Sequence, residues 1–339
     1  MVAIGFTLSS EEHGPQDLLL YGRIAEEVGF DFLTISDHFH PWTSRQGQSP
    51  FVWNVLGGLA VKTERVPIMT GVTCPTMRLH PAIVAQAAAT TAALLPDRFV
   101  LGVGSGENLN EHVLGQGWPH PRERLEMLEE AIFLMRRLWA GELVTEWTDH
   151  YMVDRARLYT LPESPPPIAV AASSPTSAEL AGRLGDALIS TAPKRELVDA
   201  FRSTGGDGKP VLGQLTVCYG PDERKAADEA LEWWPNTSVP GELGVELLEP
   251  QQFEDAAELV TAEQVAEKVV CGPDVTAFVE KIGGFAEAGF DHVFVHQVGP
   301  RQEEFLGWAK EELLPAIDDQ LGRSDVEMPS GSSTPSDRG

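Results

Sequence analysis

The sequence predicts an α/β fold: a (β/α)8 TIM barrel, a closed ring of parallel strands, with insertions. Short apolar runs rich in β-branched residues alternate with longer segments of helical periodicity along most of the 339 residues. That alternation is typical of a parallel sheet. Eight strand segments can be counted, the number that closes such a barrel. No Gly-x-Gly-x-x-Gly motif follows the first strand, which argues against an open dinucleotide-binding sheet.

The strands and helices alternate from the amino terminus onward. Helix 16–28 is amphipathic and stops at Gly29, helix 82–95 is rich in alanine, and helix 122–139 carries its charges on one face. Further helices are expected at 51–62 and 302–321. The eight strands are expected at 2–8, 32–36, 67–73, 98–104, 168–172, 186–190, 211–219 and 291–296.

Two segments exceed a minimal barrel repeat and are predicted to be insertions. Segment 141–167 is rich in proline, and segment 221–272 is acidic and contains a Trp-Trp-Pro sequence. Residues 1–321 then form one domain. The tail 322–339 is rich in serine, proline, glycine and aspartate without apolar periodicity, so we expect it to be disordered.

Composition excludes several classes of partner. The 51 acidic against 25 basic residues give a net charge of −26, which repels nucleic acids and anionic membrane surfaces. The three cysteines are far apart and form no Cys-x-x-Cys pair, so neither a disulfide framework nor a structural zinc site is indicated. No run approaches the ~20 apolar residues that cross a bilayer. We expect a cytoplasmic protein that binds a small-molecule substrate.

In a barrel, function gathers on the loops that follow the strands. His38, beside Asp37 after the second strand, is a candidate general base. Glu107, in the glycine-rich loop 102–111, is a second acid–base candidate, and Trp42 is a candidate pocket wall. The alternatives are ordinary ones: a histidine or glutamate that caps its loop, and a tryptophan that packs in an interface.

His38 and His40 also raise the possibility of a metal site, since the two rings of a His-x-His sequence at a strand end face the same side. His296 is the one further ligand expected nearby, so we assign no metal. Small residues at 71–76 and 171–174 favour a long, flat, phosphate-bearing cofactor. The alternative for each is ordinary packing at a strand end.

Four runs, 36–42, 76–87, 102–111 and 137–141, resemble the luciferase-like flavin and deazaflavin oxidoreductases. The resemblance extends from Ile4 to about Leu314, and within the family it is strongest to the branch of F420-dependent glucose-6-phosphate dehydrogenase. It implies a bacterial luciferase-like barrel, a homodimer and the cofactor F420. It also implies a cis peptide bond without proline near Thr73-Cys74.

The resemblance implies roles for individual residues. His38 would be the base, Glu107 the acid, and Trp42 would stabilise the reacting substrate. Ser173 and Ser174 stand where relatives have two glycines. The residues expected to contact F420 are Asp37, Thr73, Cys74, Thr76, Gly104, Gly106, Glu107, Asn110, Ala171, Ala172, Ser173 and Ser174.

The basic residues that bind the sugar phosphate in the relatives are only partly present. Lys194 matches one of them and, with Trp42, is expected to bind substrate. Glu267 and the Phe290-Asp291 position do not match. We therefore expect hydride transfer between F420 and an unphosphorylated alcohol or carbonyl rather than strict use of glucose 6-phosphate. An FMN-dependent monooxygenase and a non-catalytic flavin-binding protein are the alternatives.

Overall fold

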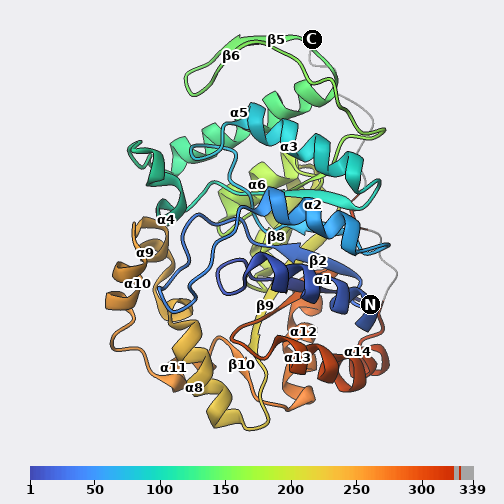
Figure 1. Ribbon diagram of the computed structural model, residues 1–339, viewed down its shortest axis with the longest axis vertical. Helices are drawn as coiled ribbons and strands as arrows, with labels where there is room; N and C mark the ends of the chain where they lie inside the picture. Colours follow the sequence, from blue (N-terminus) through green and yellow to red (C-terminus); the bar gives the residue numbers. More distant parts are fainter. Residues whose placement is uncertain (324–327, 330–339) are drawn as a thin grey trace.

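A closed barrel of parallel strands forms the centre of the molecule in the computed structural model, which describes residues 1–323 and 328–329 (Figure 1). Residues 324–327 and 330–339 of the tail predicted at 322–339 therefore lie outside the described residues. Pairing of β8 with β9 and of β11 with β1 closes the ring, which confirms the predicted barrel. The strands of the ring are β1 (Ala3–Leu8), β2 (Phe32–Ile35), β3 (Ile68–Thr70), β4 (Phe99–Val103), β7 (Ile168–Ala171), β8 (Ala187–Ser190), β9 (Val211–Cys218) and β11 (His292–Gln297).

Helices surround the barrel, and their ends follow local sequence rules. Several begin with proline in the first turn, where no amide hydrogen is needed. The first helix ends at Gly29, whose φ of 102° favours glycine. The helices are α1 (Pro15–Val28), α2 (Val52–Lys62), α3 (Pro81–Leu94), α4 (Asn108–Glu111), α5 (Pro121–Trp139), α6 (Pro175–Leu184), α7 (Arg195–Phe201), α12 (Val275–Ala288), α13 (Gln302–Trp308) and α14 (Leu314–Gln320).

An apolar plug fills the inside of the barrel. Phe32 and Phe294 meet edge to face there, with ring centroids 6.3 Å apart, and Ile189 and Met69 pack with them. A larger apolar layer lies between the strands and the helices. Because the plug occupies the barrel interior, the cavity at the carboxyl ends of the strands has an apolar floor.

Both segments predicted as insertions carry structure of their own. Segment 141–167 forms an antiparallel hairpin of β5 (Val144–Trp147) and β6 (Met152–Ala156), which stands out at the top of Figure 1. Segment 221–272 forms helices beside the barrel mouth and a short strand that extends the sheet from β9. Its elements are α8 (Glu223–Trp233), α9 (Gly241–Glu246), α10 (Pro250–Ala256), α11 (Ala262–Ala266) and β10 (Val270–Cys271). That residues 1–321 form one domain stays a prediction.

We find no candidate membrane-spanning helix within residues 1–323. None of the helices there combines the length and the apolar character that crossing a bilayer requires.

Candidate active site

A cavity of about 1240 Å³ opens where the strands of the barrel end. It is the place where most of the predicted site residues meet, although they come from loops far apart in the sequence. Thr73, Thr76 and Lys194 are the exceptions, since none of them lines it. The predicted residues that line the cavity are Asp37, His38, Trp42, Cys74, Gly104, Gly106, Glu107, Asn110, Ala171, Ala172, Ser173 and Ser174.

The His38 ring is held from three sides. Its Nε2 lies 3.3 Å from Oε1 of Glu11, a carboxylate on the loop after β1. Its Nδ1 lies 3.2 Å from the carbonyl oxygen of His40 and 3.1 Å from Nδ2 of Asn110. The Trp42 indole packs against the same ring at a centroid distance of 5.0 Å. These contacts hold the imidazole in place at the cavity wall.

Glu107 lies beside the same ring nitrogen as Glu11. Its Oε2 lies 3.7 Å from His38 Nε2 and accepts a hydrogen bond of 3.3 Å from Nδ2 of Asn110. Asn110 is oriented in turn, because its Oδ1 accepts hydrogen bonds from the backbone amides of Phe39 and His40. About 35% of the Glu107 side chain is exposed, and this residue lines the cavity, where a ligand would bind.

The two carboxyl groups beside His38 have opposite pKa shifts. Burial raises the pKa of Glu11, but the His38 ring and a hydrogen bond from the Ser36 hydroxyl outweigh it, so the net pKa is lowered. Burial raises the pKa of Glu107, and the opposing effect of His38 is too small to reverse it. One imidazole thus stands between a carboxylate that stays ionised and a carboxyl that holds its proton more firmly, which is typical of acid–base sites.

A buried charge network lies behind this wall. The Arg78 guanidinium donates a hydrogen bond of 2.9 Å to Oδ1 of Asp37, and its Nε lies 3.8 Å from Oε1 of Glu111. Asp37 also accepts a 2.7 Å hydrogen bond from the Thr73 hydroxyl. The side chains of Arg78, Asp37 and Glu111 are at most 6% exposed. A single guanidinium therefore balances two carboxyl groups under the loop that carries Glu107.

Glu111 makes stability depend on pH. Burial raises its pKa to about 7, against the hydrogen bond and the charge of Arg78, while Asp37 and Glu107 add to the rise. Between about pH 4.5 and 7 the folded chain therefore holds more protons than the unfolded chain, so the free energy of unfolding falls as the pH rises. Urea unfolding near pH 5 and near pH 7.5 should show a larger fall for the wild type than for Glu111→Gln. Parallel changes in the two proteins would contradict this assignment.

The loop after β3 differs from the expectation. β3 ends at Thr70, three residues before the predicted end, because the chain leaves the sheet at Gly71. The cis peptide bond joins Gly71 to Val72, so its predicted place near Thr73-Cys74 is wrong. Thr73 is fully buried and orients Asp37. Thr76 is buried outside the cavity lining. Contact of these two threonines with a cofactor stays a prediction.

Comparison with known proteins decides the family. A family model described as "Luciferase-like monooxygenase" matches residues 2–292. The chain belongs to this luciferase-like family. The insertions, the glycine-rich loop after β4 and seven of the eight barrel strands lie within the matched range, which ends at the first residue of β11.

Relatives within the luciferase-like family share nearly the full length of the chain. An F420-dependent glucose-6-phosphate dehydrogenase of Beutenbergia cavernae is 39% identical, covering 94% of this chain and 98% of the relative. A second one, of Microbacterium testaceum, is 38% identical, with 92% and 96% covered. A solved F420-dependent secondary alcohol dehydrogenase, in complex with an F420–acetone adduct, superposes with a TM-score of 0.86. It is 32% identical, with 93% of this chain and 99% of that chain covered.

Two neighbouring Glu–Lys pairs line the cavity, and one position that was expected to bind phosphate lies elsewhere. Glu267 and Lys268 line the cavity, as do Glu280 and Lys281, so each lysine stands beside an acid. Asp291 does not line it. This residue directly precedes β11 and hydrogen-bonds the amide of Val211 at the start of β9. It therefore lies at the opposite end of the barrel from the cavity, and the expectation that its position binds substrate phosphate is wrong.

Lys194 lies at the edge of the cavity. It is exposed and immediately precedes α7, directly after three residues that line the cavity, Thr191, Ala192 and Pro193. Contact between Lys194 and a substrate stays a prediction.

Some site residues of this luciferase-like chain carry no motif in the sequence. Glu11 follows β1 in a short polar stretch, and only its distance to His38 reveals a role. Arg78 stands in a run that the family resemblance covers, but its two carboxylate partners come from separate loops. Gln214 lines the cavity from β9 and contacts His296, and its place on a strand that ends at the cavity was the available signal.

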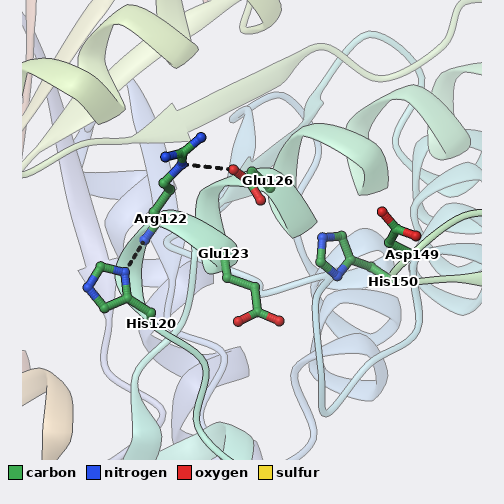
Figure 2. A pocket seen from close by; sticks show the side chains of 6 residues that line it. All are labelled: His120, Arg122, Glu123, Glu126, Asp149 and His150. Carbon is green, nitrogen blue, oxygen red and sulfur yellow. Dashed lines mark hydrogen bonds and ion pairs between the residues drawn. The ribbon is translucent and has the colours of Figure 1, made fainter.

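A second hollow, of about 430 Å³, lies on the outer surface between the start of α5 and the turn of the β5–β6 hairpin (Figure 2). Arg122 pairs with Glu126 at 3.0 Å and donates its amide hydrogen to the His120 ring. His150 and Asp149 face these groups from the hairpin turn. Within residues 1–323, no three His, Cys, Asp or Glu side chains are grouped as metal ligands.

Proposed function

We propose that this protein oxidises an uncharged alcohol to a carbonyl compound, or catalyses the reverse reaction, at the cavity around His38. It is an F420-dependent oxidoreductase like its close relatives. The observation that carries the proposal is the imidazole placed between Glu11 and Glu107, whose pKa values are shifted in opposite directions. Such a group can accept a proton from a hydroxyl and be returned to its starting state.

The cavity wall suits a flat cofactor. A Cβ atom at Gly104 would lie 2.8 Å from Cγ2 of Val72, so this position needs glycine beside a residue that lines the cavity. Ala171 and Ala172 add two more small side chains to this part of the cavity wall. Ser173 and Ser174 then lead into the first turn of α6, where the Ser174 hydroxyl caps the Ser177 amide and the positive end of the helix dipole favours an anionic group. Bound F420 would supply the hydride acceptor, the C5 atom of its deazaflavin ring.

His38 is the base in this proposal. In the tautomer whose Nδ1 donates its proton to the His40 carbonyl, the lone pair of Nε2 can take the hydroxyl proton of the substrate beside the two carboxyl groups. The Glu11 carboxylate, 3.3 Å away, then stabilises the imidazolium that forms. The other tautomer, in which Nδ1 accepts from Asn110, places the proton on Nε2 and removes the base.

Glu107 and Trp42 are the other two residues to which we assign a role in the reaction. Burial raises the pKa of Glu107, and in this proposal its carboxyl group donates a proton toward a ligand in the cavity. The Trp42 indole is fixed between His38 and Phe253, whose ring meets it edge to face at 5.2 Å. Its π-face can stabilise positive charge on the imidazolium or on the reacting carbon.

The two Glu–Lys pairs of the cavity favour an uncharged substrate, because a phosphate dianion would meet Glu267 and Glu280 as well as the two lysines. Glu267→Lys should therefore raise kcat/KM for glucose 6-phosphate by about tenfold, the effect of one charge-assisted hydrogen bond. Glu263→Lys, an equal charge change on α11 at a residue outside the cavity lining, is the matched control. An equal gain in both variants would mean that these pairs do not select the substrate.

The proposal is tested by measuring cofactor binding and turnover with the purified protein. We expect tighter binding of F420 than of FMN, and loss of the oxidised F420 absorbance when an uncharged secondary alcohol is added. Oxygen consumption with reduced FMN would instead support a monooxygenase. Tight binding of F420 without turnover of any alcohol or carbonyl compound would support a flavin-binding protein.

We also propose that the chain forms a homodimer through the β5–β6 hairpin. Trp147 and Met152 are cross-strand partners on one face of the hairpin, and each is 76% exposed. An apolar pair so exposed is typical of a surface that a second chain covers. Light scattering should give a dimer for the wild type and a monomer for Trp147→Glu with Met152→Glu. A wild-type monomer, or a dimer that survives both changes, would contradict this.

A further inference from the structure

A second imidazole–carboxylate pair stands next to the first. Glu12 directly follows Glu11, and its Oε2 lies 3.8 Å from Nε2 of His296, at the end of β11. Glu12 is 6% exposed and His296 is 3% exposed. An indole packs on this ring too, since Trp234 meets His296 edge to face at 4.7 Å. His296 and Trp234 both line the cavity.

The second pair leads to an amide that faces the cavity. Gln214 on β9 is half-buried, lines the cavity and has its Nε2 3.4 Å from Nδ1 of His296. In the tautomer with its proton on Nε2, on the side of Glu12, the Nδ1 atom of His296 accepts a hydrogen bond from Gln214. This leaves the Gln214 carbonyl oxygen and one amide hydrogen without partners among the described residues. Glu12 is itself fixed, since its Oε1 accepts a 2.7 Å hydrogen bond from the amide of Gly299.

Stability alone does not account for this arrangement. Oε2 of Glu12 and Nε2 of His296 are both buried, and neither makes a hydrogen bond within the described part of the chain. Burying such groups costs free energy, and apolar residues would fill the same place without that cost. Glu12 and His296 do, however, hold the side-chain amide of Gln214 at a defined position on the wall of the cavity that His38 also lines.

We propose that Gln214, positioned by His296 and Glu12, binds a second oxygen atom of the substrate while His38 acts on the first. The substrate class is then a diol, a polyol or the corresponding hydroxycarbonyl compound. This inference rests on the proposed oxidation of an uncharged alcohol. His38 and Gln214 line the same cavity, and their supporting residues Glu11 and Glu12 are neighbours in the chain, so the proposal places the two oxygen atoms on nearby carbons of one molecule.

Isopropanol and propylene glycol test this directly, because both contain a secondary alcohol and only the glycol has a second hydroxyl. Gln214→Leu should lower kcat/KM for propylene glycol about tenfold, mainly through KM, and change that for isopropanol less than about twofold. Thr216→Val is the matched control: Thr216 lines the cavity from the same strand and makes no side-chain hydrogen bond in the described chain. It should leave the ratio of the two substrates unchanged. An unchanged ratio in Gln214→Leu would overturn the proposal.

The positioning residues have their own test. Glu12→Leu should reproduce the loss of glycol preference, and Glu12→Gln, which keeps an acceptor for the His296 proton, should restore most of it. Equal effects of the two changes would contradict the positioning role. The F420 dissociation constant, followed by fluorescence, should stay within about twofold in Gln214→Leu; a large increase would mean that Gln214 binds the cofactor instead.

Direct binding separates this inference from the proposed function. The dissociation constant of propylene glycol can be measured by saturation-transfer NMR on the protein without cofactor. It should rise about tenfold in Gln214→Leu even if neither alcohol is oxidised. If F420 fails to bind but this rise is seen, the proposed function fails and the diol site stands. If oxidation proceeds but glycol binding is unchanged by the substitution, only the diol site fails.

Discussion

Replacing His38 with alanine is expected to lower kcat by at least about 100-fold and to leave the F420 dissociation constant within about twofold. The imidazole lies beside both Glu11 and Glu107, so its loss removes the proton acceptor and leaves the two carboxyl groups without the ring that they share. The small residues that would hold the ring, such as Gly104 after β4 and Ala171 at the end of β7, are not changed. Steady-state kinetics and a fluorescence titration of F420 measure the two quantities.

His40→Ala is the matched control for this variant. His40 is two residues away on the same loop, and its ring contacts the Leu109 carbonyl and stacks on His112 rather than facing Glu11. Its loss should lower kcat less than about tenfold. A His38→Ala variant that keeps its turnover, or two variants that lose activity equally, would mean that the base is elsewhere.

Replacing Arg78 with methionine is expected to lower the free energy of unfolding by about 3–5 kcal/mol, the cost of leaving buried charges without their partner. Asp37 and Glu111 would both lose the guanidinium that balances them, in a place from which water is excluded. Urea unfolding followed by circular dichroism measures the change. Part of the loss should be recovered below the Glu111 pKa of about 7, where this carboxyl group is protonated.

Arg122→Met provides the comparison. Arg122 pairs with Glu126 one turn along α5, but their side chains are 85% and 52% exposed. Water screens this pair, so the substitution should change the free energy of unfolding by less than about 0.5 kcal/mol. Similar losses in the two variants would contradict the special role assigned to the buried network.

Much of the barrel could be predicted because its strands are short apolar runs between helices, and a parallel strand buried on both faces has that signature. All eight barrel strands lie close to their expected positions. The end of β3 was placed three residues too far along, since Val72 and Thr73 continue the β-rich pattern after the chain has left the sheet. The β5–β6 hairpin was not predicted, because its two strands are exposed and lack a continuous apolar face.

The site could be predicted only where a motif carries it. His38, Trp42 and Glu107 stand in recognisable loops, and the structure brings them to one cavity. Glu11 and Gln214 have no local pattern, because their roles depend on contacts across the barrel mouth. Asp291 was misplaced for a related reason: a sequence does not show which end of the barrel a residue occupies unless the strand limits are known.

Hydride transfer from an uncharged alcohol, with His38 as the base, is the central claim. The most direct test is a single-turnover experiment that follows the absorbance of oxidised F420 after mixing with isopropanol or with isopropanol deuterated at its carbinol carbon. We predict a loss of absorbance that deuterium slows in the wild type and that is nearly absent in His38→Ala. No loss of absorbance in the wild type, or an equally fast loss in the variant, would contradict the account.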